Sequence, residues 1–174
     1  FKTGRELFEN DVTELPCLVE PIIQKVGLIA LGGSSDTGKS TILRQLALDV
    51  VSGNDKFLGF ELKSSRKKAI IVSTEDDELS TSFLIKKQAQ GIEPEKLENL
   101  LFLFEDENLI DNLDRTMINQ PVDVVIIDCF SDVFGKELKD THRIRNFLNG
   151  FQKLAAKHQC LFIYLHHTGK RTED

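Results

Sequence analysis

The chain has 174 residues, with 22 basic and 28 acidic side chains that give a formal net charge of −6 at pH 7. This balance excludes a uniformly basic coat for nucleic acid, although it leaves room for a local basic patch. A hydrophobic fraction of 40% supports a folded core and excludes a disordered tail. No uncharged stretch approaches the roughly 20 residues of a membrane-spanning helix, so we expect a cytoplasmic protein that does not contact membranes.

The cysteine and methionine contents also limit the possibilities. Cys17, Cys129 and Cys160 show no C-x-x-C spacing, which argues against a disulfide scaffold or a zinc ribbon. We expect all three to be small buried residues in a reducing compartment. Because the chain starts at Phe1 and its only methionine is Met117, we expect it to be a piece of a longer protein.

Apolar strands and amphipathic helices alternate along the chain. Strands are predicted at 27–31, 69–73, 101–104, 122–128 and 161–166, with a short edge strand at 57–62. Helices are predicted at 39–51, 75–90, 108–119 and 141–158. Strands that are apolar on both faces imply a mostly parallel sheet covered on both sides, which makes a three-layer α/β sandwich. Right-handed crossovers then place any ligand at one edge of the sheet.

One motif carries most of the functional information. Residues 33–40 (GSSDTGKS) match the phosphate-binding pattern G-x-x-x-x-G-K-[ST], and they lie between a predicted strand and a predicted helix. Glycines let the backbone approach phosphates closely, and the N–H groups at the start of the helix point at the anion. Lys39 would bridge the β- and γ-phosphates, and the Ser40 hydroxyl would bind Mg²⁺. The alternative is a capped helix start that happens to carry a lysine.

The remaining residues of this loop would contact phosphate mainly through their backbone. They are Gly33, Ser34, Ser35, Asp36, Thr37 and Gly38. We expect the Asp36 carboxylate to point outward, because a negative charge would repel the phosphates. Thr41 could contact the α-phosphate or lie on the helix surface. The first helix is expected to bury an apolar stripe of Ile42, Leu43, Leu46 and Val50.

A phosphate-binding loop needs a second acid to organise Mg²⁺ at the end of a neighbouring strand. Asp128 follows the apolar run 124–127 and is placed for that role. Asp123 begins the same strand at the opposite edge of the sheet, so we expect it to be structural.

Hydrolysis also needs a base or a group that positions water. Glu75 follows the strand at 69–73 and should emerge at the same edge as Asp128. It could instead cap the helix that begins at this acidic stretch. Asp76 is the next candidate, whereas Asp77 and Glu78 are expected on the helix surface.

Two histidines, His166 and His167, end the last predicted strand. A polar side chain here would reach the γ-phosphate and could report its presence to the loop that follows. Because side chains alternate along a strand, only one of the two can face the nucleotide. The alternative is a polar strand end without a catalytic role. Adjacent strand residues face opposite ways and no further ligand cluster appears, so we do not expect the pair to bind a metal.

Together these segments resemble the RecA-fold ATPases. The resemblance rests on the loop GGSSDTGKST, the strand ends VSTED and YLHHTGK and the acid strand VVIID, and it covers about residues 15–171. It is strongest to RepA-like hexameric replicative helicases and related ATPases of plasmids and mobile elements. The spare strand at 101–104, between the Glu75 strand and the Asp128 strand, fits this topology.

The resemblance implies roles for the matching positions. Lys39 and Ser40 would hold the phosphates and Mg²⁺, Asp128 would be the Walker B acid and Glu75 the catalytic carboxylate. His167, or its neighbour His166, would sense the γ-phosphate. We therefore expect one RecA-like ATPase domain over 1–174, with a lead-in over 1–26 and the nucleotide-binding core over 27–174. The cofactors would be ATP and Mg²⁺.

The resemblance also implies that single-stranded DNA is held by loops after the Asp128 and His167 strands, in a homo-oligomeric, hexameric ring. Residues 136–174 contain eight bases and four acids, net +4, whereas residues 74–114 contain twelve acids and three bases, net −9. The basic residues that fall in or beside the loops are Lys136, Lys139, Arg143, Arg145, Lys170 and Arg171. Both charge runs could equally be solvated surface.

Two classes of function fit the sequence. The first is the motor core of a DNA helicase or DNA-remodelling enzyme, with active sites between the subunits of a ring. The second is an ATP-dependent regulatory switch that hydrolyses ATP slowly and does not unwind DNA. A small-molecule kinase is a distant third, because no lid segment follows the acid strand and no acceptor pocket is evident.

Overall fold

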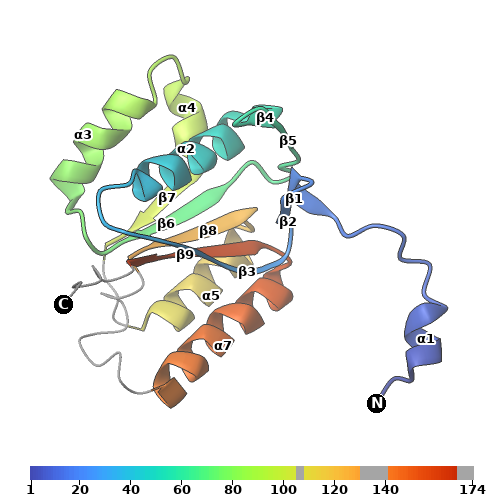
Figure 1. The fold of residues 1–174 in the computed structure, drawn as a ribbon. Helices are drawn as coiled ribbons and strands as arrows, with labels where there is room; N and C mark the ends of the chain where they lie inside the picture. Colours follow the sequence, from blue (N-terminus) through green and yellow to red (C-terminus); the bar gives the residue numbers. More distant parts are fainter. Residues whose placement is uncertain (105–107, 130–140, 168–174) are drawn as a thin grey trace, which may run out of the picture.

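The computed structural model of the chain describes residues 1–104, 108–129 and 141–167, with side chains from 144 onward in the last range. Within these ranges, the centre of the fold is a five-stranded parallel sheet (Figure 1). In spatial order its strands are β3 (Gly27–Gly33), β9 (Leu161–His167), β8 (Val124–Asp128), β6 (Ala69–Ser73) and β7 (Leu100–Leu103). Every neighbouring pair is parallel, which confirms the predicted parallel sheet.

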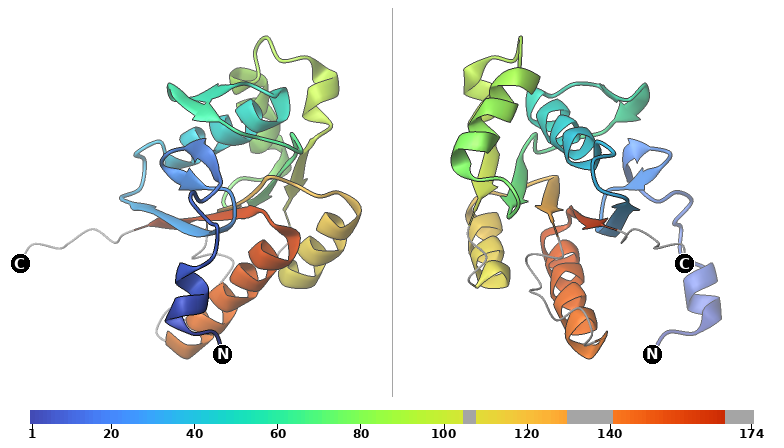
Figure 2. Two further views of the ribbon diagram at one scale, coloured as in Figure 1. Left: turned by 90° about the vertical axis from the view of Figure 1, so that its right-hand side faces the viewer. Right: turned by 60° about the vertical axis from the view of Figure 1, so that its left-hand side comes forward.

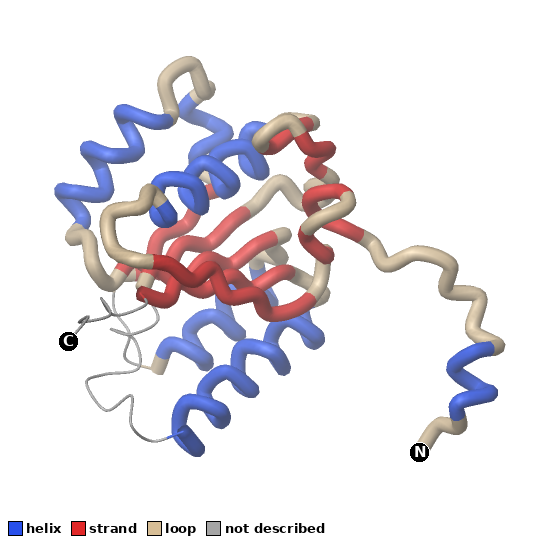
Figure 3. The backbone as a smooth tube through the Cα atoms, viewed as in Figure 1, coloured by secondary structure: helices blue, strands red, loops and turns tan. Residues whose placement is uncertain are grey.

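Helices cover both faces of this sheet (Figures 1 and 3). One face carries α2 (Lys39–Ser52), α3 (Glu78–Gln88) and α4 (Pro94–Leu97), and the other carries α5 (Leu109–Asn119) and α7 (Thr141–His158). A separate cluster of buried apolar side chains fills the space on each face. The predicted three-layer α/β sandwich is therefore confirmed. Every helix in the described part of the chain is too short or too polar to cross a lipid bilayer.

The strand order places β9 between β3 and β8, so one strand separates the strand that feeds the phosphate-binding loop from the strand that ends in Asp128. The spare strand β7 lies between β6 and β8 in the chain, but in space it is the last strand of the described sheet and pairs with β6. The strands β6 and β8 are buried along their whole length, as expected for central parallel strands.

The start of α3 differs from the prediction. The helix begins at Glu78, and Asp77 caps it by accepting a hydrogen bond from the Ser80 N–H at 2.7 Å. An aspartate at this position satisfies one of the unpaired N–H groups of the first turn, so Asp77 is a cap and not simple helix surface. Glu75 consequently lies outside the helix and is not its cap.

The segment 57–62 is not one edge strand of the central sheet, so that prediction was wrong. It forms a tight hairpin of β4 (Lys56–Phe57) and β5 (Phe60–Leu62), turned at Leu58 and Gly59 with φ of 48° and 87°. Two successive left-handed residues are the geometry of a two-residue hairpin turn.

This hairpin belongs to a second, four-stranded sheet of order β2-β1-β5-β4. Its other two strands are β1 (Cys17–Glu20) and β2 (Ile23–Gln24), which lie in the expected lead-in. Leu18 and Val19 are fully buried in the same cluster as α2. Residues 1–16, including the short helix α1 (Gly4–Phe8), are exposed and extend away from the body of the molecule (Figure 2).

The carboxylate of Asp123, 1% exposed, anchors the amino-terminal end of β8. One of its oxygens accepts hydrogen bonds from the N–H and hydroxyl of Ser65, and the other accepts from the N–H groups of Arg66 and Lys67, at 2.7 to 3.2 Å. A buried carboxylate with this many donors is well satisfied. Asp123 therefore holds the loop before β6 against β8, at the edge opposite the phosphate-binding loop.

We predict that Asp123→Asn destabilises the fold, because either orientation of the amide points an NH₂ group at backbone donors. The free energy of unfolding, measured in urea, should fall by about 1–3 kcal/mol. Asp111→Asn, on the exposed surface of α5, is the matched control and should change it by less than about 0.5 kcal/mol. Equal stability of the two variants would show that Asp123 does not anchor the loop.

Candidate functional site

The alternation of side chains along the strands brings polar groups together at one edge of the sheet. Ile71 on β6, Ile126 on β8 and Leu165 on β9 all pack in the cluster beneath α2. The residue two positions further along each strand faces the same way, and these residues are Ser73, Asp128 and His167. Because parallel strands end at a common edge, this polar set lies where α2 begins.

The phosphate-binding loop, residues 33–38, connects β3 to α2 and closes around the side chain of Lys39. The Lys39 ammonium donates to the carbonyl oxygen of Ser34 at 2.6 Å and to the Thr37 hydroxyl at 3.3 Å. The Thr37 hydroxyl also donates to the Ser34 carbonyl at 3.0 Å. Gly38 has a φ of 81°, a left-handed conformation that suits glycine and turns the chain into the helix. Lys39 is therefore held inside the loop and is only 8% exposed.

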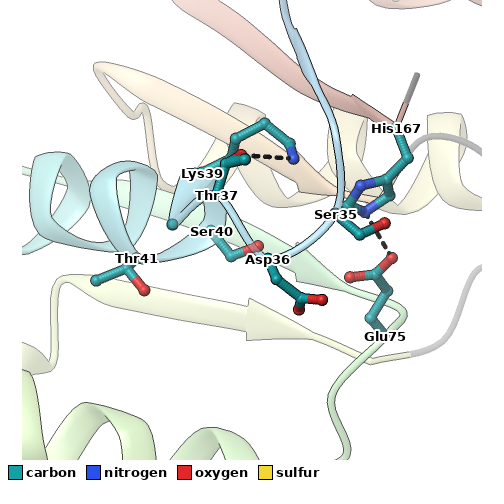
Figure 4. A pocket seen from close by; sticks show the side chains of 9 residues that line it. Ser35, Asp36, Thr37, Lys39, Ser40, Thr41, Glu75 and His167 are labelled. Carbon is teal, nitrogen blue, oxygen red and sulfur yellow. Dashed lines mark hydrogen bonds and ion pairs between the residues drawn. The ribbon is translucent and has the colours of Figure 1, made fainter. Parts of the chain in front are cut away.

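An open cavity of about 410 Å³ lies over this loop (Figure 4). This is the volume range of small-molecule sites. Its lining residues are Ser35, Asp36, Thr37, Gly38, Lys39, Ser40, Thr41, Glu75 and His167. The fold thus gathers most of the residues predicted from the motif, together with the predicted base and one of the two histidines. Asp36 and Thr41 are both exposed at the rim.

Glu75 and His167 are in direct contact across the cavity from Lys39 (Figure 4). His167 Nε2 lies 2.9 Å from Glu75 Oε1, which is hydrogen-bonding distance. The Glu75 side chain is 41% exposed and that of His167 25%, so both can reach a ligand in the cavity. The neighbouring His166 follows Tyr164 and Phe162 in the alternation on β9, on the face covered by α5 and α7. Of the two predicted sensor residues, His167 is therefore the one that lines the cavity.

Asp128 lies beneath the start of α2 and is 9% exposed. Burial raises the pKa of its carboxyl, the Ser40 hydroxyl partly offsets this, and the carboxylate of Glu75 raises the pKa further. Its buried Oδ1 has no hydrogen-bond partner among the described groups. A buried carboxylate oxygen left unpaired beside a hydroxyl is a suitable donor set for a hard cation such as Mg²⁺. The residues present therefore fit the predicted metal.

Arg44 is a residue of the site that the sequence analysis missed. It is 7% exposed, donates to Gln88 Oε1 on α3 at 2.8 Å and lies 3.6 Å from Asp76 Oδ2. Asp76 therefore faces Arg44 and does not line the cavity.

The expected apolar stripe of α2 is buried at Leu43, Leu46 and Val50, whereas Ile42 is 43% exposed. The sequence signal for Arg44 was its spacing from Ser40, because a residue one helical turn after Ser40 lies on the same side of α2.

Most of the predicted nucleic-acid residues cannot be placed relative to the cavity. Lys136, Lys139, Lys170 and Arg171 lie outside the described residues, as does the side chain of Arg143. Arg145 is exposed on α7, on the face of the sheet opposite α2, and does not line the cavity.

We predict that Asp128→Asn does not destabilise the protein at neutral pH in the absence of divalent cations. The folded-state pKa of Asp128 is raised, so ionisation of this group reduces stability as the pH rises from about 4, the value in unfolded chains. The variant should therefore melt at or above the parent's temperature at pH 8, and the difference should shrink as the pH falls toward 4. A variant that melts lower at pH 8 would contradict this account of the carboxylate.

Comparison with known proteins agrees with this geometry. A family model described as an AAA domain matches residues 4–173. Among solved structures, a KaiC-like protein from the hyperthermophilic archaeon Pyrococcus horikoshii OT3 superposes with a TM-score of 0.64 at 17% identity, over 88% of this chain and 67% of that one. Curated protein sequences gave no match. The chain therefore belongs to the AAA domain family, with the fold of a RecA-like P-loop ATPase.

Proposed function

We propose that this domain binds ATP with Mg²⁺ and hydrolyses it as the core of a RepA-like DNA helicase or DNA-remodelling motor. The single observation that carries the hydrolytic part is the Glu75–His167 contact, which faces the phosphate-binding loop across one cavity. A loop that only bound a phosphate would not require a carboxylate and an imidazole opposite it. The family supports the ATPase activity, and the resemblance of the motifs supports the helicase subtype.

The triphosphate binds along the loop. Backbone N–H groups at the start of α2 and the Lys39 ammonium compensate the charge of the β- and γ-phosphates. Ser40 and Asp128 would hold Mg²⁺, which when bound neutralises charge on the phosphate oxygens. The Ser34 carbonyl and the Thr37 hydroxyl keep the Lys39 side chain inside the loop, so little conformational freedom is lost when phosphate arrives.

Glu75 is the group that orients the attacking water and accepts its proton. It lies across the cavity from Lys39, as an in-line attack on the γ-phosphate requires. His167 fixes one oxygen of the carboxylate at 2.9 Å and leaves the other for water. When the γ-phosphate is present, its negative charge also attracts His167. The hydrogen bond between His167 and Glu75 then changes as the phosphate is released by hydrolysis.

This contact provides a route to mechanical output. His167 ends β9 and continues into residues 168–174, which include Lys170 and Arg171. We propose that these basic residues, with those that follow Asp128, bind single-stranded DNA in a homo-oligomeric, hexameric ring. The presence of the γ-phosphate would then change the affinity for DNA through His167.

An ATP-dependent regulatory switch is the second candidate, and the same contact favours it. The hydrogen bond to His167 ties the position of the Glu75 carboxylate to that of the imidazole, which suits slow, gated turnover. The two candidates differ in whether DNA accelerates hydrolysis.

We predict that Glu75→Gln retains ATP binding and loses turnover, because the amide cannot accept the proton. The steady-state rate should fall by roughly 10²-fold or more, while the ATP affinity measured by calorimetry changes little. Glu78→Gln, an exposed position in the first turn of α3, is the matched control and should turn over normally. An unchanged rate in Glu75→Gln would assign the base to another residue.

The experiment that separates motor from switch is ATP turnover by the full-length protein with and without single-stranded DNA. A motor predicts marked stimulation and a steep loss of DNA affinity with salt, both reduced in the charge-reversal variant Lys136→Glu/Lys139→Glu. Lys87→Glu/Lys153→Glu, at exposed positions on α3 and α7, changes the net charge by the same amount and is the control. An ATP turnover rate that is the same with and without DNA would reject the motor proposal and leave the regulatory switch.

A further inference from the structure

Cys129 lies beside the Glu75–His167 pair, although the hydrolysis proposed above does not use it. One carboxylate oxygen of Glu75, the sulfur of Cys129 and one ring nitrogen of His167 all lie within 4.8 Å of one another. Cys129 is fully buried, whereas His167 is half-buried and Glu75 borders the cavity. From the sequence alone, this cysteine is expected to be a small buried residue, and the histidines have no further metal ligand near them. In the fold, Cys129, which directly follows β8, is brought next to His167 at the end of β9.

Backbone contacts hold the three side chains in this arrangement. The N–H of Thr74, the residue before Glu75, donates to the carbonyl of Asp128 at 2.9 Å, and the N–H of Cys129 donates to the Thr74 hydroxyl at 3.0 Å. The Cys129 sulfur lies 3.8 Å from the carbonyl of Leu165, two residues before His167. The segments that carry the three groups are therefore fixed to one another, as a preformed site requires.

The donor set is that of a thiophilic cation. Thiolate, imidazole and carboxylate are the ligands of tetrahedral Zn²⁺ sites, and three protein ligands leave a fourth position open. Bond lengths of about 2.0–2.3 Å place such ligands roughly 3.3–3.8 Å apart. The three groups lie within 4.8 Å of one another, so each separation has to change by about 1 Å or less when a cation enters. The pair Ser40 and Asp128 differs in kind, because its hard oxygen donors suit Mg²⁺.

We propose that Glu75, Cys129 and His167 form a binding site for a thiophilic divalent cation of the Zn²⁺ type, whose occupation arrests the ATPase. Binding forms a metal–sulfur bond as the Cys129 thiol loses its proton to solvent, and no group changes its oxidation state. The bound cation occupies the Glu75 carboxylate and the His167 imidazole, the two side chains that hydrolysis needs. The arrest rests on the proposed function, whereas metal binding does not.

Co²⁺ tests the site directly, because a cobalt–thiolate bond gives an intense near-ultraviolet charge-transfer band. The full chain should develop this band on titration with Co²⁺ and lose it when Zn²⁺ is added. Cys129→Ser should abolish the band, whereas Cys17→Ser, which removes a half-buried thiol elsewhere, should retain it. Cys160 is no competing site, because its thiol lies against Met117 in the apolar cluster on the other face of the sheet, where burial raises its pKa to about 12.

Glu75→Gln keeps the test valid if Cys129→Ser fails to fold, because Glu75 is partly exposed. It should weaken Co²⁺ binding on the order of 10–100-fold while thermal unfolding stays unchanged. A parent chain without the band, a band that survives Cys129→Ser, or an unchanged Co²⁺ affinity in Glu75→Gln would each overturn the site.

The second readout is turnover at saturating Mg²⁺. Low Zn²⁺ should inhibit the parent and Cys17→Ser, reversibly on addition of a chelator selective for Zn²⁺, and should leave Cys129→Ser active. Inhibition that persists in Cys129→Ser would overturn the proposed arrest. A parent that shows the cobalt band but no ATP turnover at all would reject the proposed function and retain the metal site.

Discussion

The common edge at which β3, β6, β8 and β9 end is the constraint on which the site depends. Parallel pairing in register, with Ser73 opposite Asp128 and Gly33 opposite His167, aligns residues that are far apart in the chain. Alternation along each strand then turns Asp128 and His167 toward the face that α2 covers. Since α2 begins at the same edge, its amino-terminal N–H groups and the strand-end polar groups surround one space.

The two buried carboxylates of the β8 region show how the fold divides stability from function. Asp123, at the amino-terminal end, accepts four hydrogen bonds and holds a loop in place. Asp128, at the other end, keeps one buried oxygen that has no partner among the described residues, and burial raises the pKa of its carboxyl. A buried group left unsatisfied is destabilising unless a ligand completes it, so the two ends of one strand serve opposite purposes.

The sequence predicted those features of the fold and the site that depend on local residue patterns. The loop at 33–40, the buried strands and the strand-end positions of Glu75, Asp128 and the two histidines all follow from spacing and from the edge rule for parallel sheets. Which of His166 and His167 faces the cavity was left open. What it missed depends on contacts between distant segments. The second sheet pairs β1 with β5 across about 40 residues, and no local pattern indicates that pairing. Arg44 is buried and Ile42 is exposed because the partners of Arg44, Asp76 and Gln88, follow β6, more than 30 residues further along the chain.

Cys129 was missed for the same reason, since its neighbours in space come from the ends of two other strands, β6 and β9. Buried cysteines are common and have no pattern of their own, so only the packing of β6, β8 and β9 reveals the contact with Glu75 and His167. The helix at 78–88 shows the limit of the charge pattern. Four consecutive acids suit a helix start, but only the cap at Asp77 determines which of them lie outside the helix.

The central claim is that the cavity at this edge is an ATP site organised around Lys39. Calorimetric titration of ATP with Mg²⁺ into the parent and into Lys39→Ala, with circular dichroism to confirm that both fold, tests it most directly. The account predicts saturable binding by the parent and no measurable binding by the variant, since the loop would lose the buried cation that lines the cavity. Equal ATP affinity in the two proteins would contradict the assignment of the loop and, with it, the mechanism built on Glu75 and His167.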